Sequence, residues 1–120
     1  MLASDGASAA SRFTVTTVPW VRPDGVEVIP DFGTLANGQA LRAPINVHAD
    51  GSYRSSPVQA ITGVPNGGNP AEPGTATSTC ANWTGLGSRA SGDALQADTT
   101  WHRSSAAQCN VSAPVYCLQE

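Results

Sequence analysis

Turn-forming residues divide this chain into short segments, and this feature limits its fold more than any other. The 120 residues include 12 glycines and 9 prolines, and no stretch repeats apolar residues with the period of a long helix. Short runs of β-branched and aromatic residues lie between the turns instead. The pattern predicts one domain, residues 1–120, of the α+β class: mostly antiparallel β, with long loops and one or two short helices.

The clearest local signals lie in the first third of the chain. Residues 20–29 read as a hairpin whose turn is Arg22–Gly25, because proline fixes φ, aspartate bonds to its own backbone and glycine accepts positive φ. Asp31 then stands where an N-cap is expected, Leu35 would face the core, and Gly38 ends the segment. These residues predict a single short helix.

The remaining elements are predicted from weaker patterns. A second hairpin joins residues 45–48 to 52–54 through the turn 49–51. Further strands are predicted at residues 13–16, 79–83, 113–118 and around 100–102, loops at 63–74 and 85–93, and a brief helix over 7–12 capped from Ser4 and Asp5.

The number and sign of the charged residues indicate which partners the protein can bind. Charged residues make up 12% of the chain, about half the share of roughly 25% in an ordinary soluble domain. The six arginines are scattered, lysine is absent and the net charge is -3. Nucleic acids need a basic patch, so we expect no nucleic-acid partner. The bias toward alanine and arginine indicates a GC-rich bacterial genome.

Neither a membrane span nor an export signal is evident in the sequence. No stretch approaches the ~18 apolar residues of a span, and Met1–Gly6 lacks the basic and apolar regions of a signal peptide. If the protein is secreted, its export signal lies outside this chain.

Three cysteines, Cys80, Cys109 and Cys117, fall in the last third of the chain. An odd number indicates an unpaired thiol, an intermolecular bridge or a missing partner. No two are close enough for a zinc knuckle, and neither histidine stands at ligand spacing from them, so we predict no metal site. A catalytic thiol would need His102 as its base. A structural disulfide is the favoured interpretation.

The end of the chain resembles the terminal strand of C-type-lectin-like domains. Cys109 and Cys117 enclose seven residues, and Val115–Glu120 resembles the family's terminal strand of the form aromatic-X-Cys-X-acid. Other segments resemble the endostatin branch and its bacterial relatives, in the same order along the chain: Val18–Val21 with Phe32–Leu35, Ile45–Val47 with Asp50–Gly51, Ile61–Gly63, Cys80–Trp83 and Ser105–Cys109. The resemblance implies a C-type-lectin-like fold of the endostatin type.

The resemblance also implies how the cysteines pair. In the family the first cysteine bridges the fourth and the second bridges the third, which makes Cys80–Cys109 the inner pair. The partner of Cys117 would precede Met1, so we expect a domain that lacks its N-terminal strand and helix. Cys117 is then unpaired or intermolecular. The strand Val115–Leu118 would expose an edge, and either feature offers a route to an oligomer.

By the same resemblance, the expected function is non-enzymatic binding or adhesion outside the cell or at its surface, with a protein, matrix or glycan ligand. Lectins of this kind hold sugars through calcium, which needs six to eight oxygen ligands. Candidate oxygens come from Asn66, Asn69, Glu72 and Asp98. The family's motif letters stand in a different order here, so a solvated turn is the favoured interpretation of this loop and calcium is the second. We expect no other cofactor.

Two alternatives stay open. A hydrolase would use His102 with hydroxyl and carboxylate neighbours such as Ser104 and Asp98, and a structural assembly module would be bridged by Cys117. No nucleophile elbow, HExxH motif, P-loop or Rossmann fingerprint occurs, so we predict that the protein is not an enzyme. His102 is expected to be a half-exposed strand residue. The tryptophans Trp20, Trp83 and Trp101 are expected in the core.

Overall fold

The computed structural model describes residues 1–14 and 17–118. The elements are, in chain order, η1 (Ala10–Arg12), β1 (Trp20–Val21), β2 (Glu27–Ile29), α1 (Phe32–Ala36), β3 (Gln59–Ile61), α2 (Cys80–Trp83), β4 (Ser88–Asp93), η2 (Thr99–Trp101) and β5 (Ser105–Gln108). Both sheets are antiparallel, and the helices are short. The architecture therefore agrees with the predicted α+β, mostly-β class.

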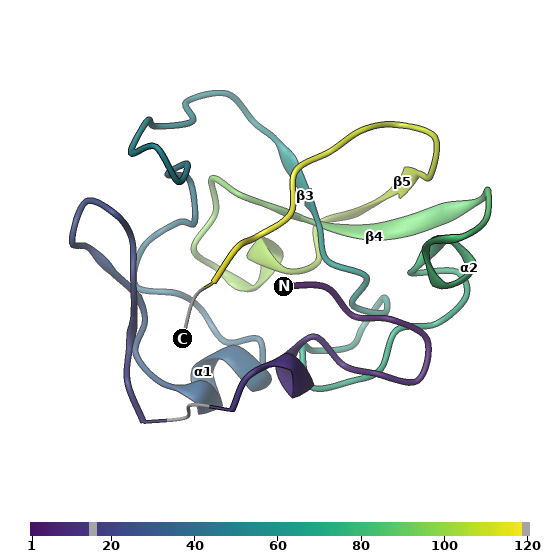
Figure 1. The fold of residues 1–120 in the computed structure, drawn as a ribbon, viewed down its shortest axis with the longest axis horizontal. Helices are drawn as coiled ribbons and strands as arrows, with labels where there is room; N and C mark the ends of the chain where they lie inside the picture. The colour runs from purple at the N-terminus through teal and green to yellow at the C-terminus, as the bar shows by residue number, and fades with distance from the viewer. Residues whose placement is uncertain (15–16, 119–120) are drawn as a thin grey trace.

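The larger sheet has the strand order β3-β4-β5 and lies on one side of the molecule, with α1 and η1 opposite it in Figure 1. β4 is the central strand, pairing Ala60 with Gly92 on one side and Ala90 with Ala106 on the other. The β1-β2 hairpin forms a separate two-stranded sheet. No helix in the described part of the chain is both long and apolar enough to cross a membrane.

The first hairpin and the helix after it form as the sequence predicts. Gly25 has φ +83°, and its amide donates to the carbonyl of Arg22. The carboxylate of Asp31 accepts the amide of Thr34 at 2.7 Å, which caps α1. Gly38 ends the helix with φ +60°. The local turn chemistry therefore fixes both elements.

The second hairpin also forms, but it is less regular. Its strands meet at a single bridge between Val47 and Tyr53. The amide of His48 donates to the carbonyl of Ser52 at 2.9 Å, and the carboxylate of Asp50 accepts the amide of Ser52 at 2.9 Å. The aspartate thus stabilises the turn, as short polar side chains do.

Four predictions in the second half of the chain are wrong. Residues 79–83 form the short turn α2 and not a strand, residues 99–101 form the 3-10 turn η2, and the predicted loop 85–93 contains β4. Residues 113–118 make only one bridge, Val115 to Ile61. The strand β4 was not predicted from the sequence because it contains small residues such as Gly92 and Ser91, which are not β-branched and do not favour a strand.

Near the N-terminus, the brief helix shrinks to η1 and begins after Ala9 without a side-chain cap. Ser4 and Asp5 instead lie in isolated bridges, to Ala7 and Gly74. Phe13 and Thr14 belong to no strand. The rest of the strand predicted over 13–16 lies outside the described residues.

The main core lies where the sheets and α1 meet. Trp101, Ile29 and Leu35 are fully buried, and Trp20 and Tyr116 lie in the same cluster. Two of the three tryptophans are thus in the core as predicted. Trp83 is only half-buried, which corrects the third prediction; its indole N–H donates to the carbonyl of Ala3 at 3.0 Å. The indole is thus partly exposed to solvent, and its N–H still has a hydrogen-bond acceptor.

Candidate binding cleft

A cleft of about 580 Å³ lies between the two hairpins and the C-terminal segment 114–118. Its lining includes Trp20, Val28 and Tyr116, which belong to the buried core. Val21 and Val115 also line it and keep 53% and 41% of their surface exposed. An apolar concavity of this size is in the range of ligand sites, roughly 300–1,000 Å³.

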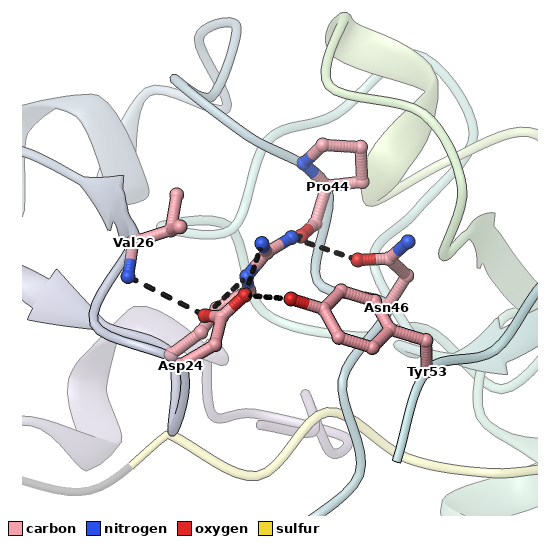
Figure 2. Close-up of polar contacts among 6 residues, drawn as sticks. Asp24, Val26, Pro44, Asn46 and Tyr53 are labelled. Atoms are coloured by element: carbon pink, nitrogen blue, oxygen red, sulfur yellow. Dashed lines mark hydrogen bonds and ion pairs between the residues drawn. The ribbon is translucent and has the colours of Figure 1, made fainter. Parts of the chain in front are cut away.

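The wall between the hairpins is held by the guanidinium of Arg22. It donates to the carboxylate of Asp24 at 2.7 and 3.1 Å, to the carbonyl of Pro44 at 3.0 Å and to the amide oxygen of Asn46 at 2.8 Å. Figure 2 shows these bonds converging from both hairpins. A planar fork of donors suits this task better than an ammonium group would. The wall is therefore pre-organised.

Tyr53 completes this cluster. Its hydroxyl donates to Asp24, and its ring lies 5.7 Å from the guanidinium carbon of Arg22. The hydrogen bonds from Arg22 and then from Tyr53 hold the pKa of Asp24 far below its usual range. The bond to Asp24 raises the pKa of Tyr53. Both groups thus keep the charge states that favour the contact at neutral pH.

Arg54 also lines the cleft, and its guanidinium is without a partner among the described residues. Its backbone amide donates to the carbonyl of Asn46 at 2.8 Å, while its Nε is buried with no acceptor. No aspartate or glutamate is among the described residues that line the cleft. An unsatisfied donor beside an apolar surface favours a ligand that brings its own acceptor.

The three cysteines have two different states. Cys80 and Cys109 form a disulfide with Cα atoms 5.8 Å apart, which links α2 to the end of β5. Cys117 is a free, exposed thiol at the cleft. Beside it, the amino group of Met1 donates to the carbonyl of Tyr116, and burial lowers the pKa of that amino group. The pairing of Cys80 with Cys109 is thus as expected.

The predicted calcium residues lie in three separate settings. Asn69 and Glu72 share one turn, in which Glu72 Oε1 accepts the amide of Asn69 at 3.3 Å. The carboxylate of Asp98 caps η2 by accepting the amide of Thr100 at 2.9 Å, and hydrogen bonds from Thr100 lower the pKa of Asp98. Asn66 is exposed and lines a second, smaller cavity. Within the described ranges no three His, Cys, Asp or Glu side chains gather as metal ligands; calcium binding stays a prediction.

His102 lies elsewhere than expected. It is 1% exposed and follows η2, so the prediction of a half-exposed strand residue is wrong. Its ring lies 4.9 Å from that of Trp101, and its Nδ1 is buried without a partner. Burial, and then the charge of Arg103, lower its pKa to about 4. The hydroxyl of Ser104 donates to the carbonyl of Ser91 at 3.5 Å, so neither it nor the capping group Asp98 is held by the imidazole.

Comparisons with protein-family models, curated proteins and solved structures give no match for this chain.

Val21 and Arg54 line this cleft, although neither is among the site residues predicted from the sequence. The exposure of Val21 could have been predicted, because successive side chains of a strand point to opposite faces and Val21 follows the buried Trp20. The sequence around Arg54 does not show that its charge lacks a partner. The tertiary fold decides which acidic residue pairs with which arginine, and it pairs Asp24 and Glu27 with Arg22 and Arg42. This part of the cleft is visible only in the structure.

Proposed function

We propose that this protein is a non-enzymatic binding module, acting outside the cell or at its surface, and that its cleft receives an apolar group of a protein, matrix or glycan ligand. The cleft is the observation that supports this proposal. Its lining carries exposed valines, Val21 and Val115, which a ligand can cover. Burial of apolar surface is the main source of affinity at such sites.

The rigidity of the surrounding walls supports the same proposal. Arg22 joins the turn of the first hairpin to the chain entering the second, through Asp24, Pro44 and Asn46. A pre-organised site loses less conformational entropy when it binds. Loops held on a disulfide-linked β scaffold are a common platform for recognition.

We also propose that the fold is C-type-lectin-like, of the endostatin type. The order of first hairpin, short helix and second hairpin supports this, as does the bridge between Cys80 and Cys109.

One specific observation favours a second role, that of an assembly module. Cys117 is free and exposed at an apolar cleft, where a disulfide to another chain would also cover the valines. The hydrolase alternative gains no such support, because His102 is buried and its Nδ1 has no partner. A hydrolytic activity that is lost in a His102→Ala variant would restore that alternative.

The binding proposal is tested with a panel of immobilised matrix proteins and a glycan array, each with and without calcium. Val21→Asp places a charge at the cleft, whereas Val26→Asp alters the same hairpin at a valine that is 39% exposed and does not line the cleft. We expect Val21→Asp to weaken binding by about tenfold or more, since burying an unpaired charge is costly. Val26→Asp should bind like the unmodified protein.

Two results would contradict the proposal. One is that no member of either panel is bound; the other is that the two variants bind equally well. A requirement for calcium would revive the predicted site at Asn66, Asn69, Glu72 and Asp98.

A further inference from the structure

A second cavity, of about 300 Å³, lies beside β4 and β5. Two arginines line it: Arg89 on β4 and Arg103 just before β5. Hydroxyl and amide side chains complete the polar lining, from Asn66, Thr77, Ser78, Ser104 and Ser105. The fold thus brings together two of the arginines that appear scattered in the sequence.

Arg89 is the deeper of the two cations. Only 5% of it is exposed, its Nη2 donates to the carbonyl of Val111 at 2.5 Å, and its Nε is buried without an acceptor. A buried charged donor that lacks a partner is unfavourable. Arg89 thus brings to the cavity a positive charge that no described acidic residue neutralises.

Arg103 adds a second positive charge that nothing in the described chain neutralises. Its guanidinium makes no hydrogen bond or ion pair with a described residue, and no aspartate or glutamate is among the described residues that line the cavity. Its charge helps to lower the pKa of the neighbouring His102. By contrast, Arg22 and Arg42 are paired with Asp24 and Glu27.

We propose that this cavity binds a phosphate monoester. Two guanidinium groups match the charge of about -1.5 to -2 that such a group carries at pH 7, and the nearby hydroxyls are donors for its oxygens. A sulfate ester carries only one negative charge and no titratable proton near neutral pH, so it fits the pair less well. This inference is independent of the apolar cleft.

The test is a titration of the protein with phenyl phosphate and, separately, with phenyl sulfate, followed by NMR chemical shifts. We expect phenyl phosphate to bind more tightly, and its affinity to fall as the pH drops through the second phosphate pKa near 6. Arg103→Gln should weaken phenyl phosphate binding by about tenfold, the loss of one charge-assisted contact. Arg42→Gln is the matched control, because it removes a guanidinium that is paired with Glu27 and lines neither cavity; it should bind as the unmodified protein does.

Salt provides a second measurement that needs no variant. Affinity for phenyl phosphate should fall steeply as sodium chloride rises, because both cations are then screened. The proposal is overturned if neither ligand binds at low salt, if phenyl sulfate binds as tightly as phenyl phosphate, or if Arg42→Gln loses as much affinity as Arg103→Gln.

Discussion

The imidazole of His102 lies between an aromatic ring and a glycine that makes room for it. A β-carbon at Gly38 would stand 2.6 Å from His102 Nε2, and the ring of Trp101 lies on another side at 4.9 Å. The glycine that ends α1 therefore has a second task, which is to admit this side chain. Burial then lowers the pKa of His102 to about 4, so the native state holds the ring neutral.

This buried residue predicts how stability depends on pH. The pKa of His102 is about 4 in the folded state and about 6.5 in an unfolded chain, so the unfolded state binds the proton more strongly. The contribution of neutral His102 to the free energy of unfolding is complete above pH 6.5 and is lost as the pH falls toward 4. We expect the urea midpoint to decrease between pH 6.5 and 4.5.

The control for this prediction is His48→Gln, which removes an exposed imidazole and should leave the decrease intact. The aspartates with lowered pKa, such as Asp24, lose their contributions only below the ordinary aspartate range near 3.9. A urea midpoint that stays constant over this window would show that His102 is not held neutral by burial.

At the scale of elements, α2 differs most from what its sequence indicates. Cys80, Ala81, Asn82 and Trp83 all have positive φ, from 51° to 66°. Left-handed backbone costs an L-residue about 1–2 kcal/mol, so tertiary contacts must hold the turn. Those contacts are the Cys80–Cys109 bridge and the bond from the amide of Asp5 to the side-chain oxygen of Asn82, at 3.0 Å.

The strain in α2 predicts that Ala81→Gly stabilises the protein. Ala81 is exposed and has φ 51°, a conformation that glycine adopts freely. We expect the free energy of unfolding to rise by about 1 kcal/mol, measured by urea denaturation. Ala106→Gly, at an exposed position of β5, should lower it by about 0.5–1 kcal/mol. Equal destabilisation by both variants would argue against a left-handed turn.

For the molecule as a whole, the sequence predicts what depends on neighbours along the chain. The hairpin around Asp24 and the cap at Asp31 were both predicted from residues within four positions of each other. Both predictions are confirmed. The strand β4 is stabilised by β3 and β5 on either side, which local propensity cannot reveal. The segment at Val115 has strand-like residues but finds one bridging partner.

The candidate sites follow the same division. The pairing of Cys80 with Cys109, which the resemblance implies, is present. Cys117 has no disulfide partner among the described residues, and whether it is unpaired or intermolecular stays a prediction. The cleft walls, and the placement of Arg89 and Arg103 around one cavity, depend on contacts between distant segments. Spacing along the chain therefore could not disclose them. The resemblance to endostatin-type domains stays a prediction.

The central claim is that the cleft receives apolar groups. Cys117 allows a direct test, because it lines that cleft and is the only free thiol among the described residues. The measurement is the fluorescence of Nile Red, a neutral apolar dye, titrated with the protein before and after Cys117 is alkylated by N-benzylmaleimide. We predict saturable binding that is lost after alkylation, because the benzyl group occupies the cleft. Dye binding that is absent from the start, or unchanged by alkylation, would contradict the claim.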